Sequence, residues 1–538
     1  MTLATTRAVA VVGVRGHLVE VEADLSPGVP SFVLVGLPDA SLHESRDRVR
    51  AAMVNSQQRW PPTTRRLTIN LSPASLPKRG SSFDLAIALA VLAADRVVPP
   101  AVVADAVLLG ELGLDGRVRP VRGVLPAVLA ACEAGVESVV VPAANAAEAA
   151  LVPGMRVTGV RSLAQLIALA RGEPVPLELE AVGIELPDAR SSRADAAAAA
   201  DAAAAADAAA DGVADPARLD LADVLGQADA RAMIEVAAAG GHHLLMVGPP
   251  GAGKTMLAER LPGLLPPLDR AAAIDVTAVH SVAGTLPSGS PLVTRPPFQA
   301  PHHTASVAAI VGGGSTHIRP GAASLAHCGV LFMDEAPEFA PAVLDALRQP
   351  LESGEICVAR LAAQVRFPAR FQLVLAANPC PCGQSVVRGR DCMCSPMAKL
   401  RYFGRLSGPL LDRVDLRREM RPATRRELRA DRGLAESTAV VAERVLAARE
   451  RMTGRLAGTP WLANAEVPGH AMRRDWPLPW DVVAAAEREL DRGNLTARGV
   501  DRVLRVAWTI ADLAGRDGPG ADEVAMALRY RGVERTTA

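Results

Sequence analysis

The segment best suited to chemistry is an eight-residue loop, Gly248-Pro249-Pro250-Gly251-Ala252-Gly253-Lys254-Thr255. It follows a short apolar run, residues 243–247, and precedes a helical segment that begins at Met256. Glycines let the backbone curl so that its N–H groups point inward at a helix N-terminus, where a phosphate binds. Lys254 is then placed to reach the β- and γ-phosphates, and Thr255 to ligate Mg²⁺. The loop therefore predicts an ATP site.

Acidic and amide side chains follow two further apolar runs. Asp334 and Glu335 come directly after residues 330–333, and Asn378 follows residues 371–377. Downstream of a phosphate loop, such an aspartate holds the shell of Mg²⁺ and such a glutamate polarises the attacking water. The amide of Asn378 is placed to orient the same water. An acidic pair at a strand end can also be merely solvated, but its position after a phosphate loop favours ATP hydrolysis.

Four of the seven cysteines lie in one short segment, as Cys380, Cys382, Cys392 and Cys394. Four thiolates suit tetrahedral zinc, although each pair is spaced more tightly than in the common zinc motifs. Free buried cysteines are the alternative. The segment predicts a structural zinc site, whereas Cys132, Cys328 and Cys357 are typical of small core residues.

Five histidines gather around the same region, and their spacing matches no metal motif: His280, His302, His303, His317 and His327. We expect them to form hydrogen bonds in loops.

The elements that must position these residues can be read from the apolar pattern. Residues 243–247, 329–333 and 371–375 are apolar runs with helical segments between them. Such runs are typical of buried parallel strands covered by helices. The sequence therefore predicts an α/β fold with a three-layer α/β/α core around the phosphate loop. From about Ser437 onward the pattern is purely helical, which predicts a helical lid.

The rest of the chain predicts a second α/β domain and a spacer. Residues 7–172 mix β-branched runs with helical stretches. Residues 189–212 are nearly all alanine with interspersed aspartates, and they offer no apolar stripe to bury. The predicted division is an N-terminal domain at 1–175, a linker at 176–217, an ATPase core with the cysteine segment at 218–436, and a lid at 437–538.

Composition and charge restrict the function further. The chain has 538 residues, 49% of them apolar and 22% charged, which is ordinary for a multidomain globular protein. Its 58 basic and 58 acidic residues balance, so any basic surface must be local. It contains no apolar stretch of membrane-spanning length and no secretory signal. We therefore expect a cytoplasmic protein with no membrane partner.

Several motifs together resemble one family: FQAPHHT at 298–304, GGG at 312–314, RPG at 319–321, NPCPCG at 378–383 and LSGPLLDRVD at 406–415. They are similar to the YifB/ComM family of AAA+ ATPases, which resemble the magnesium-chelatase motor subunit. The resemblance implies a homo-oligomeric ring, usually a hexamer, with ATP and Mg²⁺ between subunits. It implies that Arg413 is the arginine finger and that Arg498 is the second sensor of the lid. The alternative for Arg413 is an ion pair with Asp412 or Asp415.

The N-terminal segments 36–40, 69–74 and 76–85 resemble the Lon-protease-like fold that this family carries. This raises the alternative of an ATP-dependent protease with Ser82 as its nucleophile. Leu125 stands where the lysine base of such proteases belongs, so no base takes the serine proton. We expect a protease-like scaffold that is not a protease.

The family resemblance also implies a substrate, single-stranded or branched DNA, and an activity, helicase action and branch migration in homologous recombination of incoming DNA. A recombinase is a candidate partner. Residues 354–367 are typical of a β-hairpin, which we expect to project into the pore. Local charge agrees with DNA binding, since basic residues prevail in one region: Arg366, Arg370, Arg388, Arg390, Lys399, Arg401, Arg405, Arg417, Arg418, Arg421, Arg425, Arg426 and Arg429. The alternative is a chelatase-type motor that remodels a protein partner for metal insertion.

Overall fold

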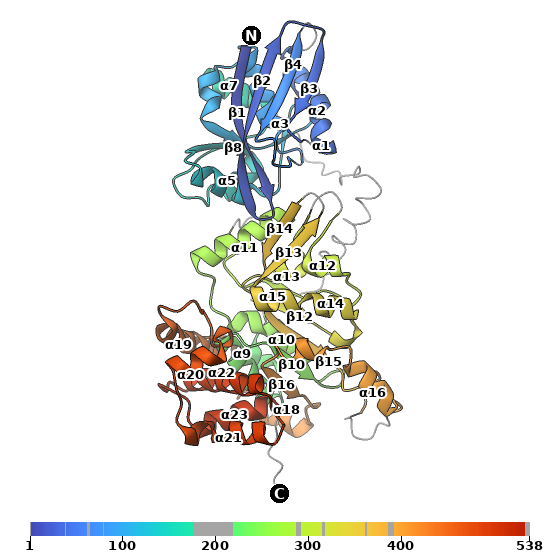
Figure 1. Cartoon of the computed structure of the whole chain (residues 1–538), viewed down its shortest axis with the longest axis vertical. Coiled ribbons are helices and arrows are strands. Elements are labelled where there is room, and N and C mark those ends of the chain that lie inside the picture. The colour runs from blue at the N-terminus through green and yellow to red at the C-terminus, as the bar shows by residue number, and fades with distance from the viewer. Residues whose placement is uncertain are drawn as a thin grey trace.

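The computed structural model describes residues 2–37, 39–61, 65–78, 80–175, 219–286, 292–314, 318–360, 363–385 and 392–532. The predicted linker, residues 176–217, lies outside the described residues. Figure 1 shows an N-terminal α/β part at one end of the long axis, a central α/β part, and a group of C-terminal helices beside the far end of the central part. The predicted fold class, α/β with a helical C-terminal region, is confirmed.

A seven-stranded mixed sheet organises the N-terminal part, in the order β3-β4-β2-β1-β5-β8-β9. Its longest strands, β1 (Thr2–Val12) and β2 (Arg15–Ser26), pair in antiparallel fashion. Helix α3 (Asp84–Ala94) packs on both strands, and all its residues are buried because the segment is apolar almost throughout. The other strands are β3 (Ser31–Val35), β4 (Arg66–Ser72), β5 (Ala106–Leu108), β6 (Glu111–Leu112), β7 (Val118–Arg119), β8 (Ser138–Pro142) and β9 (Arg156–Val160). The other helices are α1 (Ala40–His43), α2 (Ser45–Asn55), α4 (Pro100–Ala104), α5 (Val124–Glu133), η2 (Ala143–Asn145), α6 (Ala146–Ala149) and α7 (Leu163–Arg171).

The central part is built on a five-stranded parallel sheet in the order β11-β12-β15-β10-β16. Leu244 and Met246 belong to one buried apolar cluster, and Leu245 between them belongs to another. Both faces of the sheet are therefore covered, which makes it the middle of three layers. The strands are β10 (Leu244–Val247), β11 (Phe298–Gln299), β12 (Val330–Met333), β15 (Gln372–Ala377) and β16 (Leu416–Glu419).

The helices of the central part lie before, between and after these strands in the chain. They are η4 (Leu221–Asp223), α9 (Ala228–Gly240), α10 (Lys254–Leu264), α11 (Arg270–Ala283), α12 (Val307–Val311), α13 (Ala322–Leu325), η5 (Ala336–Glu338), α14 (Pro341–Ala346), α15 (Arg348–Ser353), α16 (Pro396–Phe403), α17 (Gly408–Leu411) and α18 (Arg425–Asp431). Figure 1 shows α16 projecting from the side of this part and α11 lying towards the N-terminal part.

The hairpin expected over residues 354–367 is present. Strands β13 (Glu355–Arg360) and β14 (Ala363–Pro368) pair in antiparallel fashion. The hairpin lies against the N-terminal part, because a Cβ added to Gly13 in the β1–β2 turn would lie 2.7 Å from the carbonyl oxygen of Arg366. The expectation that the hairpin projects into a pore stays a prediction.

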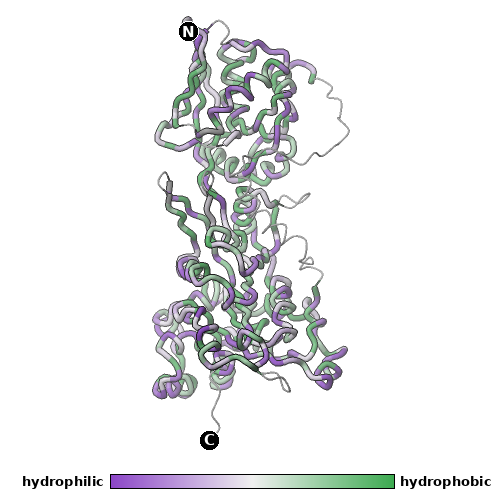
Figure 2. The backbone as a smooth tube through the Cα atoms, turned by 90° about the vertical axis from the view of Figure 1, so that its right-hand side faces the viewer, coloured by the Kyte–Doolittle hydropathy of each residue, from purple (hydrophilic) through white to green (hydrophobic). Residues whose placement is uncertain are grey.

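The C-terminal helices pack on the central sheet and on one another. Val445 of α19 and Val503 of α22 share a buried cluster with Leu244 and Met246 of β10. In Figure 2 hydrophilic (purple) residues are frequent on the helices at the end of the molecule that carries the C-terminus. None of the helices in the described part of the chain combines the length and apolar character needed to span a bilayer. The elements are α19 (Thr438–Leu456), η6 (Asn464–Glu466), α20 (Gly469–Asp475), α21 (Trp480–Asp491), α22 (Ala497–Leu513) and α23 (Ala521–Tyr530).

Helices α5 and α11 join the N-terminal part to the central part. Ala278 of α11 is buried in an apolar cluster that otherwise consists of N-terminal residues. One carboxylate oxygen of Glu148 accepts hydrogen bonds from the backbone N–H of Leu125 (2.9 Å) and from Oγ of Ser281 on α11 (2.5 Å). This contact combines apolar packing with a buried, charge-assisted hydrogen bond.

Candidate nucleotide site

The phosphate loop lies between β10 and the N-terminus of α10, as the sequence predicts. Gly251 and Gly253 have φ angles of 78° and 88°, a region that glycine adopts readily and L-residues do not. A Cβ at either position would meet no atom within 4 Å, so backbone conformation rather than space requires glycine there. The N–H of Gly248 donates to the carbonyl oxygen of Ala377 over 3.0 Å, which ties the loop to β15.

Lys254 is buried at the first position of α10. Its ammonium group donates to the carbonyl oxygens of Gly248 (2.6 Å) and Pro249 (3.1 Å) and to Oδ1 of Asn378 (3.2 Å). Burial lowers the pKa of Lys254, and the carboxylates of Asp334 and Glu335 offset that lowering only in part. The amino group is thereby held against the carbonyl oxygens of the phosphate loop and next to the amide of Asn378, which is predicted to orient water.

The two predicted acidic residues lie at the carboxyl end of β12. Oγ1 of Thr255 donates to Oδ2 of Asp334 over 2.9 Å. Hydroxyl and carboxylate oxygens are ligands that Mg²⁺ prefers, so this pair fits the predicted magnesium site. Glu335 has a φ of 50°, a strained conformation for a residue with a side chain.

His303 belongs to this site, although its sequence position predicted only loop hydrogen bonding. Its Nδ1 lies 3.5 Å from Oε2 of Glu335, and the ring centroid of His302 lies 4.1 Å from that of His303. Both histidines line one cavity with Thr255, Asp334 and Glu335 of the predicted site. The other lining residues are Glu259, Phe298, Ala300, Pro301 and Phe332. The sequence signal that could have pointed to His303 was the adjacent histidine pair within the segment FQAPHHT, residues 298–304.

Two of the other histidines do form loop hydrogen bonds. Nδ1 of His280 lies 2.9 Å from Oγ1 of Thr285, and Nδ1 of His327 accepts from the N–H of Arg370 over 3.1 Å. His317 lies outside the described residues.

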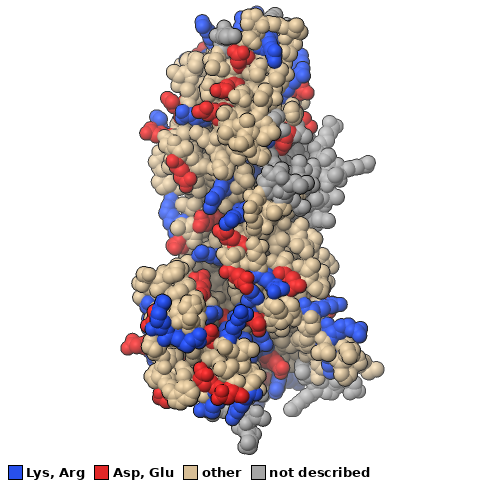
Figure 3. All heavy atoms as spheres, in the orientation of Figure 1, with Lys and Arg blue, Asp and Glu red and all other residues tan. Residues whose placement is uncertain are grey.

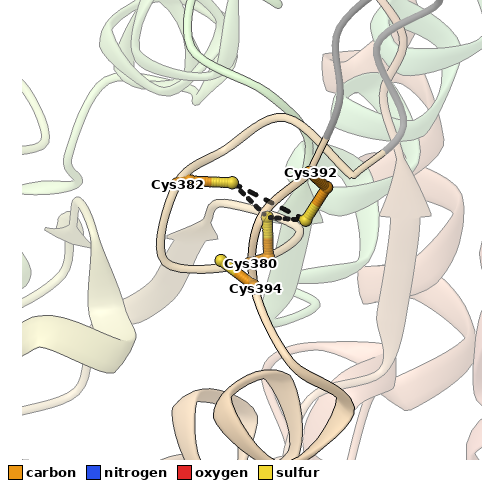
Figure 4. A group of neighbouring side chains, drawn as sticks. All are labelled: Cys380, Cys382, Cys392 and Cys394. Atoms are coloured by element: carbon orange, nitrogen blue, oxygen red, sulfur yellow. Dashed lines mark hydrogen bonds between the residues drawn. The ribbon is translucent and has the colours of Figure 1, made fainter.

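Asn378 leads directly into the four-cysteine segment, whose sulfurs converge (Figure 4). Sγ of Cys380 lies 3.3 Å from that of Cys382 and 3.7 Å from that of Cys392, and all four sulfurs lie within 4.8 Å of one another. Zinc–sulfur bonds of about 2.3 Å place tetrahedral sulfurs roughly 3.8 Å apart, so this donor set fits zinc. A Cβ on Gly383 would lie 2.7 Å from Cδ of Pro250, so the segment contacts the phosphate loop.

Arg413 is not among the residues that line the cavity beside the phosphate loop. Its guanidinium pairs with Glu352 and donates to the carbonyl oxygen of Pro409 over 2.5 Å, instead of pairing with Asp412 or Asp415. Burial and the nearby charges of Arg348, Arg502 and Arg498 lower the pKa of Arg413. The charge of Arg498, the predicted second sensor, therefore acts on Arg413, the predicted finger.

The predicted basic region is divided between internal contacts and exposed surface. Arg405 pairs with Glu338, Arg418 pairs with Asp229, and Arg417 donates to the carbonyl oxygen of Leu411. Arg388 and Arg390 lie outside the described residues. On the face seen in Figure 3, basic side chains (blue) are frequent over α16 and the C-terminal helices. The exposed members of the set are Arg366, Arg370, Arg401, Arg405, Arg421, Arg425, Arg426 and Arg429.

In the N-terminal part, Ser82 precedes α3, and its carbonyl oxygen accepts from the N–H of Gly110 over 3.0 Å. Leu125 is fully buried in α5. Since an aliphatic side chain cannot take a proton, α5 supplies no base for Ser82 from that position.

Comparison with known proteins covers nearly the whole chain. The family model described as magnesium chelatase, subunit ChlI, matches residues 220–428. Two related models match residues 21–145, as subunit ChlI of Mg-chelatase, and residues 435–531, as the C-terminal part of that subunit. The phosphate loop and both carboxylates lie within the first of these ranges.

An uncharacterized protein of Mycobacterium tuberculosis is 52% identical over 99% of both chains. The competence protein ComM of Haemophilus influenzae is 41% identical, and the uncharacterized protein YifB of Escherichia coli is 38% identical, each over 99% of this chain and 98% of the relative. Lon protease 2 of Thermus thermophilus is 31% identical over 26% of this chain and 18% of that protease.

The full-length matches agree with the two α/β parts and the helical C-terminal part of the structure. The partial match agrees with a Lon-like part at one end of a larger chain. A magnesium-chelatase-like AAA+ core implies an ATPase. The chain therefore belongs to the YifB/ComM family of magnesium-chelatase-like AAA+ ATPases.

Proposed function

We propose that this protein is an ATP-driven ring motor that acts on DNA in the cytoplasm, as a helicase or branch-migration factor. The observation that carries the ATPase part is the convergence of Lys254, Thr255, Asp334, Glu335 and Asn378 at the carboxyl ends of adjacent parallel strands. These are the groups that phosphoryl transfer to water requires.

The proposed roles follow from the chemistry of each side chain. Lys254 exchanges its hydrogen bonds to loop carbonyls for bonds to phosphate oxygens. Thr255 and Asp334 would hold Mg²⁺, which when bound would supply positive charge beside the phosphates. Glu335 accepts the proton of the attacking water, which Asn378 orients. The contact between His303 and Glu335 supports a role for His303 in orienting that carboxylate.

Arg413 is proposed to complete the site of the neighbouring subunit. Stabilising a transferring phosphoryl group requires a guanidinium near the γ-phosphate, and a partner can supply it. Arg413 is not among the residues that line the cavity of its own subunit. This favours action in trans, in a ring that we propose is a hexamer, with Arg498 beside it as the second sensor.

The DNA part of the proposal rests on the relatives and on local charge. The Haemophilus influenzae relative is a competence protein by name, and this chain shares its full length. Exposed arginines on β14, α16 and α18 offer contacts for phosphates. The alternative, a chelatase-type motor that remodels a protein partner, is favoured by the family models alone, which name magnesium chelatase.

The test is the ATP hydrolysis rate of the full chain with no DNA, with a single-stranded oligonucleotide and with a four-way junction. We expect stimulation by DNA that declines steeply as salt is raised, because phosphate contacts release counterions. The variant K254A provides the background rate. Absence of both stimulation and a gel-mobility shift would exclude the DNA motor and leave the chelatase-type alternative.

The cysteine segment is proposed to hold structural zinc through Cys380, Cys382, Cys392 and Cys394. The sulfur distances support this assignment, and a tetrahedral four-thiolate site is closed to further ligands. Metal analysis should find about one zinc per chain in tag-free wild-type protein and none in the variant C380S/C382S. Wild-type protein without zinc would refute the site.

The N-terminal part is proposed to serve as a protease-like scaffold at residues 1–175, joined by the linker 176–217 to the core at 218–436 and the lid at 437–538. The buried Leu125 at the position of the base supports a part without peptidase activity. Its contacts with α11 and with the β13–β14 hairpin support a role in holding the ATPase core.

A further inference from the structure

A buried polar network surrounds the loop that carries Arg413. Asp415 follows Arg413 by two positions, and it is only 3% exposed. Its Oδ1 accepts from Arg502 of α22 over 2.8 Å, and its Oδ2 accepts from Nδ1 of the fully buried His242 over 3.0 Å. The charge of Asp415 is therefore fully paired, as burial requires.

The electrostatics of this loop agree with its geometry. Burial alone would raise the pKa of Asp415, but the hydrogen bond from His242 and the charges of His242, Arg502 and Arg505 hold it well below its ordinary value. The carboxylate therefore stays ionised. A second lid residue, Arg531, donates to the carbonyl oxygens of Val414 (2.9 Å) and Asp415 (3.4 Å). Arg502 and Arg531 thus join the loop to the lid, while the N–H of Asp415 donates to the carbonyl oxygen of His243, just before β10, over 3.1 Å.

The network continues through the lid. Nε2 of His242 lies 2.8 Å from Oγ1 of Thr509, which also accepts from Nδ2 of Asn464 over 2.9 Å. Asn464 donates in turn to Asp512 over 2.9 Å, and Asp512 pairs with Arg455 of α19. Three lid elements, α19, η6 and α22, are thus joined by side-chain hydrogen bonds to the end of the loop that carries Arg413.

The placement of the arginines gives this network a consequence. Arg498 and Arg502 lie one turn apart on α22, and both charges act on Arg413. Asp415 neutralises Arg502 within the subunit, whereas Arg413 is paired with the exposed Glu352. The buried ion pair of Asp415 therefore fixes the loop. Among the described residues, only an exposed glutamate and a backbone carbonyl hold the guanidinium of Arg413, so its side chain can reach towards a neighbouring subunit.

We propose that Asp415 is a positioning residue for Arg413, and that it transmits lid movement to the nucleotide site of the neighbouring subunit. The inference rests on the proposed role of Arg413 as the finger. Arg502 of α22 holds the loop through Asp415. A movement of the lid in response to the nucleotide bound in the same subunit therefore displaces Arg413 together with Arg498. A displacement of about 1 Å at a reacting centre is enough to change the rate by about 100-fold.

The experiment is a double-mutant cycle on the ATPase rate of the assembled full chain. The variants are R413A, D415N and R413A/D415N, and K254A gives the background. We expect D415N to lower kcat by about 10- to 100-fold with nucleotide affinity unchanged. Because Asp415 acts through Arg413, D415N should cause no further loss in the R413A background. A purely structural role would lower the rate in both backgrounds by the same factor.

The controls separate failure of this inference from failure of the finger itself. If R413A keeps the wild-type rate, the finger assignment is wrong. If R413A loses activity while D415N does not, or if the two losses multiply, the positioning role is wrong. D501N is the matched control, since Asp501 lies on α22 like Arg502 but pairs with Arg473 of α20, and it should keep wild-type kcat. If D415N fails to assemble, R502Q replaces it in the same cycle.

Discussion

At the scale of single residues, the amino group of Lys254 lies within hydrogen-bonding distance of three oxygens, two of them backbone carbonyls of its own loop. Those carbonyls satisfy an ammonium group that is largely removed from water. The same bonds set its direction before a phosphate arrives, so little rotamer entropy is lost on binding. Glu335 is likewise preset, by its left-handed backbone conformation.

The first prediction concerns Glu335. The variant E335Q keeps the size and the hydrogen-bonding capacity of the side chain but cannot accept the proton of water. We expect kcat to fall by about 100-fold or more, while binding of a fluorescent ATP analogue stays unchanged. E259Q is the control, since Glu259 lines the same cavity without following β12. A rate for E335Q near that of wild type would remove Glu335 from the reaction.

Residues adjacent in the chain were predictable, and the motifs also led us to expect Thr255 near Asp334, but other long-range pairs were not predictable. Gly251, Gly253 and Lys254 form one continuous motif whose chemistry depends only on local conformation. The pairs His303–Glu335 and Asp415–Arg502 join separate segments. No spacing encodes such pairs, because they depend on which strands and helices become neighbours.

At the scale of elements, the segment that leads into β15 depends on the neutral ring of one histidine, His327. His327, 5% exposed, accepts the N–H of Arg370 just before β15. Burial and the charge of Arg370 lower its pKa to about 4. Protonation would remove the lone pair that accepts this hydrogen bond, so the segment before β15 depends on the neutral ring.

The second prediction is therefore a loss of stability in acid. Because the folded pKa lies below the unfolded value, the stabilisation is fully present above the unfolded pKa and is lost as pH falls through the range from about 6.5 to about 4. Between about pH 7 and pH 5 the free energy of unfolding should fall by about 2 kcal/mol from this group.

Urea unfolding of wild type and H327N at the two pH values measures this term. Asparagine can still accept the N–H of Arg370 but does not titrate, so H327N should lose less stability on acidification. H470N is the control, because His470 is exposed and its replacement should leave the difference unchanged. An equal acid loss in H327N and wild type would contradict the assignment.

The elements themselves were largely predictable from apolar runs. The strands predicted around residues 243–247, 329–333 and 371–375 are β10, β12 and β15. The hairpin was predictable from alternation, but its contact with the N-terminal part was not, because alternation fixes a strand and not its neighbour. The contact between Arg502 of α22 and Asp415 was also not predicted, because the apolar pattern of the lid indicates a helix but not its neighbours.

At the scale of the whole molecule, the third prediction concerns the joint between the N-terminal and central parts. Ser281 donates to a charged, buried carboxylate of Glu148 across this joint. Removing the hydroxyl in S281A should weaken the joint by about 1.5–3 kcal/mol. Differential scanning calorimetry should then show the N-terminal part unfolding at a lower temperature.

S353A is the matched control, because Ser353 is exposed on α15 and its hydroxyl bonds only to nearby backbone groups of Gln349 and Glu355. It should leave the calorimetric profile unchanged. A profile for S281A identical to that of wild type would show that apolar packing around Ala278 holds the joint without this hydrogen bond.

The close approach of Gly13 to the carbonyl oxygen of Arg366 restricts which residues evolution can place at position 13. Gly13 has a φ of 65° and no room for a Cβ, so position 13 cannot acquire a side chain unless β14 shifts. In relatives of this chain that keep this approach of the hairpin, position 13 should therefore be inherited as glycine.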